Sequence, residues 1–275
     1  MTTDAAEGGR YFAADAEADD ELARLRLIED VFDPQTFRYL DAIGIGEGWR
    51  CLEVGAGAGS VVRWLSERVG SAGRVVAADI DPRFIGDLRE PNIELRRCDI
   101  TRDDIEPAYY DLVHCRLLLM HLDDPADVLR RMAAALRPGG WLVAEEPDAD
   151  MIKSVDPTHP LARGFDPCFR KGMDCLLAAG IMNPYFGSAL PARMADLGLE
   201  KMGNADFSFV ARGGEPWSRW WIQTWQRFAD LVIAKGILTE SEVADILRAY
   251  EDATFAYRAY MVQSVWGCKT TVLPS

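Results

Sequence analysis

The chain has 275 residues, of which 49% are hydrophobic and 27% charged, so it carries enough apolar material to bury the core of a large domain. Its 30 basic and 44 acidic side chains leave a formal net charge of −14. Charge of this sign repels the phosphates of nucleic acids and the headgroups of anionic membranes, so we expect neither as a partner.

The first forty residues predict a helical segment that precedes the main domain. Between residues 19 and 40, apolar side chains recur at helical spacing, and Asp33-Pro34 interrupts the pattern. Proline in a helix interior removes a backbone hydrogen bond and usually breaks the helix. We therefore predict two short helices, which form an N-terminal helical cap over residues 1–40.

The following stretch, residues 50–146, alternates short apolar runs with helix-like segments. This alternation is typical of βαβ units that build a parallel sheet. Because such crossovers are right-handed, we expect an α/β fold with helices on both faces of an open, doubly wound sheet. Strands are predicted at residues 51–54, 74–79, 93–98, 111–115 and 141–146, and helices at 60–69, 82–88 and 125–136.

After Pro147 the regular alternation ends, which indicates that insertions interrupt the sheet. Two helical insertions are predicted, at about residues 148–197 and 212–252, the second with a break at Gly236. Residues 41–275 would then form one domain whose insertions act as lids. Helices of the insertions are expected at residues 165–179, 188–197 and 216–250, and the remaining strands at 207–210 and 255–266.

A glycine-rich turn joins the first predicted strand to the next helix. In CLEVGAGAGS (residues 51–60), glycines at alternate positions let the backbone turn sharply and approach a ligand without a Cβ in the way. The start of the helix adds free N–H groups. We therefore predict that Gly55, Ala56 and Gly57 contact a nucleotide-like ligand. A dinucleotide such as NAD stays an alternative at this point, because dehydrogenases use a similar loop.

Three carboxylates lie at the ends of the first three predicted strands. Glu53 precedes the first glycine by two residues, and Asp79 and Asp99 end the second and third strands. These ends meet at one edge of a parallel sheet. S-adenosylmethionine (SAM) brings a sulfonium, an ammonium and no phosphate, so the charges favour SAM over a dinucleotide. Asp79 is predicted to bind the ribose hydroxyls, Asp99 the adenine amino group and Glu53 the methionine ammonium.

Together these segments resemble the class I SAM-dependent methyltransferases. EVGAGAGS is similar to their first motif, VVAADIDP to their second-strand acidic motif, RRCDI to their adenine-contact motif, and DLVHCRLLLMHLDDP with LRPGGWLVAEEPD to their fourth and fifth strands. The resemblance implies a Rossmann-like, mostly parallel seven-stranded sheet with helical lid insertions. It also implies that Ile80 and Ile100 flank the adenosine and that the backbone around Cys115 touches the methionine part.

The N-terminal and late segments resemble the lids of bacterial, especially actinobacterial, small-molecule methyltransferases. The N-terminal segment is YFAADAEADDELARL, and the late segments include GGEPWSRWW and MVQSVWG. The resemblance implies that Tyr11 and Phe12 close over the bound cofactor. We count both among the substrate-binding residues.

Methyl transfer is an in-line displacement at carbon, so the protein must hold the acceptor atom about 3 Å from the methyl group, opposite the departing sulfur. A base that removes the acceptor's proton is the one further group to look for. We predict that Glu146, at the end of the fifth strand, is this base. The alternatives are a solvated or salt-bridged Glu146 without a catalytic role, and a base among His114, His121, Glu145, Asp148 and His159.

Aromatic residues spaced three and four apart form one face of a predicted helix. Trp217, Trp221 and Trp225 belong to it, together with Trp220 and Phe228. Such a face can stack on an aromatic acceptor or surround a sulfonium by cation–π attraction, so we predict the three named tryptophans as acceptor-binding residues. The alternative is burial against the sheet or against a partner subunit, and a homodimer stays open.

The leading hypothesis is therefore a methyltransferase that uses SAM and a small aromatic or heteroaromatic natural product. The acceptor atom is oxygen, nitrogen or carbon, and an indole-type ring is one candidate for C-methylation. The alternatives are an NAD-linked oxidoreductase on a similar sheet and a SAM-fold binding protein without transfer activity.

Metal sites and targeting segments leave no signal in the sequence. The six cysteines and three histidines lack zinc-site spacing, so no metal is expected and the cysteines are read as buried thiols. No apolar run reaches the length of a membrane span, and the first residues lack the basic and apolar parts of a secretion signal. We therefore expect a cytoplasmic protein.

Overall fold

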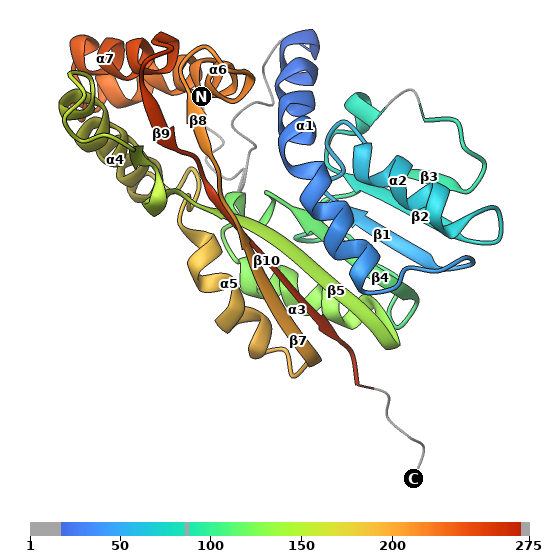
Figure 1. The fold of residues 1–275 in the computed structure, drawn as a ribbon. Helices are drawn as coiled ribbons and strands as arrows, with labels where there is room; N and C mark the ends of the chain where they lie inside the picture. Colours follow the sequence, from blue (N-terminus) through green and yellow to red (C-terminus); the bar gives the residue numbers. More distant parts are fainter. Residues whose placement is uncertain (1–17, 86–87, 271–275) are drawn as a thin grey trace, which may run out of the picture.

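A computed structural model of the chain describes residues 18–85 and 88–270 (Figure 1). Its centre is a seven-stranded sheet in the order β3-β2-β1-β4-β5-β10-β7. The first five of these strands run parallel, and β10 runs antiparallel to both of its neighbours. The predicted mostly parallel, seven-stranded sheet is confirmed. The strands are β1 (Arg50–Val54), β2 (Arg74–Asp79), β3 (Ile93–Arg97), β4 (Tyr110–Arg116), β5 (Leu136–Asp148), β7 (Glu200–Phe207) and β10 (Met261–Cys268).

Helices cover both faces of the sheet, which explains why the central strands are buried and rich in apolar residues. Leu65 of α2 (Ser60–Val69) packs in the core on one face, and Met132 of α3 (Pro125–Ala135) packs in the core on the other. The N-cap of α3 is Asp124, whose carboxylate accepts the N–H of residue 127. At the start of the helix predicted at residues 82–88, the structure has a 3-10 turn, η1 (Pro82–Ile85).

The N-terminal helix α1 (Ala18–Ala42) is one continuous helix of 25 residues, so the predicted break at Asp33-Pro34 is wrong. Pro34 removes one backbone donor, but contacts with the rest of the fold hold the turns on either side. Phe32 is buried in one core cluster and Leu40 in the other. The helix stands between α2 and α6 and contacts both (Figure 1).

The second half of the chain adds helices beyond the carboxyl end of β5 (Figure 1). There α4 and α6 both pack against α7, whereas α5 packs against β5 and β10. The strand predicted at residues 207–210 is replaced by the end of β7 and by β8, and the predicted closing strand is divided into β9 and β10. The helical block breaks at Gly236, as predicted. The added elements are β6 (Lys153–Ser154), α4 (Ala162–Ala178), α5 (Phe186–Ala195), β8 (Val210–Arg212), α6 (Pro216–Ala234), α7 (Glu240–Glu251) and β9 (Ala256–Arg258).

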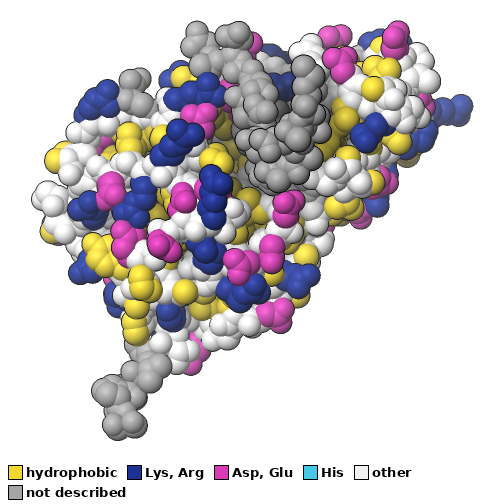
Figure 2. Space-filling model, turned by 180° about the vertical axis from the view of Figure 1, so that it is seen from behind, with side chains coloured by type: hydrophobic (Ala, Val, Ile, Leu, Met, Phe, Trp, Pro, Cys, Tyr) yellow, Lys and Arg dark blue, Asp and Glu magenta, His cyan; other side chains and the backbone are white. Residues whose placement is uncertain are grey.

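The described residues give no sign of a membrane span, a charged patch on the face in Figure 2, or a disulfide. Within the described residues, no helix has the length and apolar character needed to cross a bilayer. On the face in Figure 2, basic and acidic side chains of the described residues are interspersed rather than gathered by sign. All six cysteines are buried free thiols, as predicted.

Candidate cofactor and acceptor site

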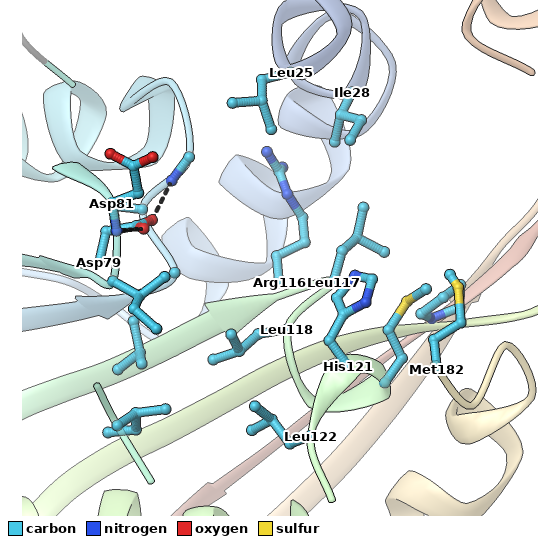
Figure 3. Close-up of a pocket in the computed structure, with 18 of the residues that line it drawn as sticks. Leu25, Ile28, Asp79, Asp81, Arg116, Leu117, Leu118, His121, Leu122 and Met182 are labelled. Carbon is cyan, nitrogen blue, oxygen red and sulfur yellow. Dashed lines mark hydrogen bonds between the residues drawn. The ribbon is translucent and has the colours of Figure 1, made fainter. Parts of the chain in front are cut away.

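A cavity of about 450 Å³ lies at the carboxyl edge of the sheet (Figure 3). The turns that follow β1, β2 and β3 form one end of it, and side chains from α1, α4 and α6 form the other. The first end carries carboxylates, whereas the second is mainly apolar and aromatic. The cavity therefore offers separate environments for a charged ligand and an apolar one.

The loop after β1 follows a backbone path that glycine adopts readily. Gly55, Gly57 and Gly59 have φ angles of 73°, 56° and 89°, in the left-handed region. The Gly55 N–H donates to the carbonyl of Ala78 at 2.8 Å, which ties the loop to β2. Gly55, Ala56 and Gly57 all line the cavity, where the sequence predicts them.

Asp79, at the end of β2, both supports this loop and borders the cavity. Its Oδ2 accepts the N–H of Gly57 at 3.1 Å, and its Oδ1 accepts the N–H of Asp81 at 2.8 Å. Burial raises the pKa of Asp79, although these two N–H donors oppose the effect. The carboxylate is therefore partly desolvated, which strengthens any hydrogen bond that it accepts from a ligand.

The residues predicted to hold an adenine ring lie together after β2 and β3. Ile80, Asp99 and Ile100 all line the cavity, and 47% of the Ile80 surface is exposed, which is high for an isoleucine at the rim of a pocket. Asp99 Oδ1 accepts the N–H of Thr101 at 3.0 Å and its hydroxyl at 2.6 Å. Burial alone would raise the pKa of Asp99, but the hydrogen bonds from Thr101 outweigh it, and the pKa is lowered. Asp99 therefore offers an ionised acceptor.

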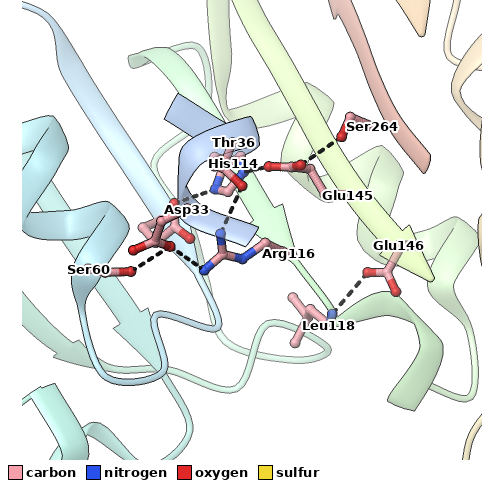
Figure 4. A network of polar contacts seen from close by, with 10 residues as sticks. Asp33, Thr36, Ser60, His114, Arg116, Leu118, Glu145, Glu146 and Ser264 are labelled. Atoms are coloured by element: carbon pink, nitrogen blue, oxygen red, sulfur yellow. Dashed lines mark hydrogen bonds and ion pairs between the residues drawn. The ribbon is translucent and has the colours of Figure 1, made fainter. Parts of the chain in front are cut away.

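A buried polar chain runs from the cavity across the sheet (Figure 4). Glu53 on β1 borders the cavity, and its Oε2 lies 2.6 Å from Nδ1 of His114 on β4. Nε2 of His114 lies 3.1 Å from Oε1 of Glu145 on β5, and Glu145 Oε2 accepts the hydroxyl of Ser264 on β10 at 2.6 Å. Glu53 is thus held in place by a chain of contacts across four neighbouring strands.

Sequence reasoning missed the polar contacts that fasten α1 to this end of the cavity. Arg116 lines the cavity, and its guanidinium donates to Asp33 at 2.9 Å and to Thr36 at 2.8 Å (Figure 4). Asp33 also accepts the hydroxyl of Ser60 at 3.0 Å, and Glu29 accepts the Ser60 N–H at 2.9 Å. The sequence offered one signal for these contacts: Arg116 is a basic residue at the end of the fourth strand, whereas the ends of the first three strands carry acidic residues.

The same helix reaches the other end of the cavity. Glu21 of α1 pairs with Arg24 of the same helix at 2.7 Å and with Arg227 of α6 at 2.5 Å. Arg24 lines the cavity, and its guanidinium lies 5.6 Å from the ring centre of Trp220. α1 is therefore a common wall of both ends.

The residues that follow Cys115, rather than its side chain, border the cavity. The Cys115 side chain is fully buried and does not line the cavity, whereas Arg116, Leu117 and Leu118 do. Cys115 still lies inside β4, where it is covered on both faces, and the chain turns only afterwards. Leu117 has a φ of 54°, and its N–H donates to the carbonyl of Glu145 at 2.8 Å, so β5 fixes this turn.

The prediction of Glu146 as the base is not supported by its position. Its carboxylate is buried and accepts the N–H groups of Leu118 at 2.9 Å, Leu119 at 2.6 Å and Met120 at 3.2 Å (Figure 4). Glu146 is absent from the cavity lining. Burial raises its pKa to about 7, against the effect of the three amides. These three contacts indicate that Glu146 helps to shape the turn after β4.

We expect Glu146→Gln to lower the free energy of unfolding by about 2 kcal/mol at pH 4.5, because the amide NH2 would face an N–H donor that now meets a carboxyl oxygen, and this loss should shrink toward pH 8. The raised pKa means that Glu146 stabilises the fold most below pH 4.5, and that this contribution is lost as the pH rises through 7. Urea denaturation from pH 4.5 to 8 measures both effects, with the exposed Glu200→Gln as control. A large loss of turnover without a loss of stability would restore Glu146 as the base.

The apolar end of the cavity contains only one of the three predicted tryptophans. Trp221 lines it, whereas Trp217 and Trp225 do not. The Trp217 ring stacks on Trp220 with centroids 4.5 Å apart, and the Trp225 ring packs edge-on against Phe169 at 5.8 Å. Tyr11 and Phe12 lie outside the described residues. The side chains that line this end include Leu25, Ile28, Met120, His121, Met173, Leu176, Met182, Trp220, Trp221, Thr224, Phe228 and Tyr260.

These aromatic rings are buried within the chain itself, so they give the homodimer no support. The predicted aromatic face of α6 is buried, but some of its rings pack in the core and others line the cavity. Trp221 and Trp225 both pack against Phe169 of α4, but Trp221 also contacts Tyr260, which lines the cavity.

Among the alternative bases, His121 is the one that lines the cavity. It lies in the 3-10 turn η2 (Leu119–His121) after β4 (Figure 3). Burial and the nearby charge of Arg24 lower the pKa of His121 to about 4, so its imidazole is neutral at pH 7. The other candidates, His114, Glu145, Asp148 and His159, do not line the cavity, and His159 instead contacts Thr254 at 3.1 Å.

The described residues contain no cluster of three metal-ligating side chains.

The sheet order and the placement of the cavity are those of the class I SAM-dependent methyltransferases. Residues 12–202 match the family described as "Methyltransferase domain", which is more than half of the chain. The chain therefore belongs to this family of methyltransferases.

Individual relatives are more distant. The methyltransferase str2 of Strobilurus tenacellus is 28% identical over 172 residues, which cover 62% of this chain and 60% of the relative. A ubiquinone biosynthesis O-methyltransferase of Burkholderia multivorans is 31% identical over 131 residues, which cover 45% of this chain and 54% of the relative. The matches thus span about half to three-fifths of these curated relatives.

Solved structures share the fold at low sequence identity. A phosphoethanolamine N-methyltransferase of Haemonchus contortus, in complex with phosphomonomethylethanolamine and S-adenosylhomocysteine, has a TM-score of 0.58 and 15% identity, covering 96% of this chain and 61% of that one. The YcgJ protein of Bacillus subtilis has a TM-score of 0.55 and 13% identity, covering 84% of this chain and 96% of that one.

Proposed function

We propose that the chain transfers a methyl group from SAM to an oxygen atom of a small aromatic or heteroaromatic natural product. One observation carries the proposal: Glu53, Asp79 and Asp99, from three neighbouring strands, border one end of a single cavity whose other end is apolar. Carboxylates at that end favour a cationic nucleoside and oppose the diphosphate of NAD, the alternative cofactor.

The residues at the polar end fit the parts of SAM by charge and hydrogen bonding. Glu53 would hold the ammonium, and Arg116, the basic residue at the same end, would hold the carboxylate. Asp79 would accept hydrogen bonds from the ribose, and Asp99 from the adenine amino group between Ile80 and Ile100. When bound, SAM supplies a methyl group already activated by the sulfonium, so the chain's task is to position the acceptor and exclude water.

The apolar end supports an aromatic acceptor. Trp220, Trp221 and Phe228 of α6 offer ring surfaces, and Met173 and Met182 add polarisable thioethers that adapt to a flat ligand. His121 lies at this end and is neutral, so it can accept a proton from a hydroxyl group. The relative named for O-methylation agrees with oxygen as the first choice.

Turnover assays test this function directly. The protein is incubated with SAM and with a set of naphthols, indoles and aromatic amines, and S-adenosylhomocysteine and methylated products are measured by mass spectrometry. We expect methylated naphthols. Transfer only to indole carbon or to amines would change the acceptor atom, and binding of SAM without any product would favour a binding protein. Calorimetric binding of NAD but not of SAM would contradict the proposal.

A further inference from the structure

His114 and Glu145, which lie behind Glu53, have no role in the proposed methyl transfer. Glu53 and His114 face each other in the register of β1 and β4, and both His114 nitrogens meet carboxylate oxygens, at 2.6 and 3.1 Å. The side chains of all three residues are at most 3% exposed. The arrangement therefore places one imidazole between two buried carboxylates, directly behind the cofactor end of the cavity.

This geometry requires a proton beyond those of a neutral imidazole. Neutral histidine has one N–H and one acceptor nitrogen, and an ionised carboxylate only accepts. The contact at Nδ1 and the contact at Nε2 can both be hydrogen bonds only if both nitrogens carry hydrogen, or if one carboxyl is protonated. Ser264 uses its own hydroxyl hydrogen for Glu145. The two carboxylates thus hold an extra proton on or next to His114.

The charges around His114 support this reading. Burial lowers the pKa of His114, but Glu53 and Glu145 outweigh it and raise the pKa to about 9. Arg116 on β4 acts on both carboxylates, and Tyr39 on α1 interacts with Glu145. Burial also raises the pKa of Glu53, while His114 lowers it in part. The extra proton is therefore bound at neutral pH and is within reach of titration.

Glu53 connects this proton to the ligand, because it is the member of the chain that borders the cavity. An ammonium group at Glu53 would compete with His114 for the same carboxylate. Two positive charges on one carboxylate repel each other, and in a partly buried site such repulsion lowers the proton affinity of the imidazole by about tenfold.

We propose that an α-ammonium nucleoside bound at Glu53 displaces part of the proton held by His114, so that His114 links cofactor affinity to pH. The inference rests on the proposed SAM site. His114 is here a positioning residue, because it acts through Glu53. The proton leaves for the solvent, and the affinity for the cofactor rises with pH, since the complex holds fewer protons than the free protein.

Isothermal titration calorimetry with S-adenosylhomocysteine measures the released protons. Titrations in phosphate and in Tris at each pH give the proton number, because these buffers differ in ionisation enthalpy. Between pH 7.5 and 8.5 we expect the wild type to release about 0.2–0.5 proton more than His114→Gln. From pH 7 to 8.5 the wild-type affinity should gain about threefold relative to the variant. The ligand's own amine titrates in both proteins, so it cancels in the difference.

Matched controls separate this effect from general pH dependence. Of the other two histidines, His159 lies outside the cavity lining, so His159→Gln is the matched control and should keep the wild-type proton release. 5′-Methylthioadenosine, which lacks the amino-acid part, should release no proton from the wild type. Equal release by the wild type and His114→Gln, or equal release with 5′-methylthioadenosine, would overturn the inference.

Two further outcomes are distinguishable. If S-adenosylhomocysteine does not bind the wild type at all, the proposed function fails together with this inference, whereas binding without the proton difference removes only the inference. If His114→Gln does not fold, ¹⁵N-histidine NMR titration of the wild type replaces it. The histidine signals are then assigned by comparison with His121→Gln and His159→Gln. The pKa of His114 should then fall by about one unit on ligand binding, and an unchanged pKa contradicts the inference.

Discussion

Asp79→Ala is expected to weaken the binding of S-adenosylhomocysteine about 10- to 150-fold, which corresponds to about 1.5–3 kcal/mol for hydrogen bonds to a charged group. The structure gives two reasons for a large effect. The carboxylate borders the cavity in a partly desolvated position, and it also holds the Gly57 N–H at 3.1 Å, so the variant would lose the proposed ligand contact and a support of the glycine loop.

Calorimetry of the wild type, Asp79→Ala and Asp79→Asn resolves these two contributions. The asparagine variant keeps one oxygen acceptor without the charge, so its affinity should lie between the other two. Asp41→Ala is the control, because Asp41 is exposed and pairs with Arg68 on the surface. Wild-type affinity in a folded Asp79→Ala protein would remove Asp79 from the cofactor site.

His121→Ala is expected to lower kcat for a naphthol acceptor by about 100-fold, the lower range of general-base catalysis, and to leave the affinity for S-adenosylhomocysteine unchanged. The kcat of the wild type should stay constant from pH 8 down to about 5. The low pKa of His121, about 4, gives the sign: the neutral, proton-accepting form is lost only as the pH falls through that value. Steady-state kinetics from pH 5 to 8 measures both effects.

An acceptor that needs no base is the decisive comparison. A nitrophenol is already ionised at pH 8, so His121→Ala should reduce its methylation far less than that of a naphthol. His159→Ala is the control, because His159 contacts Thr254 and does not line the cavity. Equal losses for both acceptors would show that His121 only shapes the cavity.

The parallel half of the sheet was predictable because its signals are local. β1, β2 and β4 are buried on both faces and are therefore rich in apolar residues, and the glycines after β1 need a left-handed backbone that few other residues adopt. The three carboxylates follow from the same fact, since parallel strands bring their ends to one edge. Their positions beside the cavity were therefore predictable without any long-range contact.

The failures concern residues whose roles depend on distant partners. Pro34 does not end α1, because packing on both sides holds the helix together. Glu146 follows a strand toward the cavity, but three amides of the turn after β4 take up its carboxylate. Trp221 and Trp225 share one helix face and both pack against Phe169 of α4, yet only Trp221 also lines the cavity. Sequence periodicity shows that such side chains are buried, not which neighbour buries them.

α1 is anchored at both ends of the cavity. Through Glu29 and Asp33 it is fastened to the start of α2, and through Glu21 to α6, while Leu25 and Ile28 face the cavity between these points. α1 therefore borders both ends of the cavity, so a substitution that displaces this helix alters both ends at once.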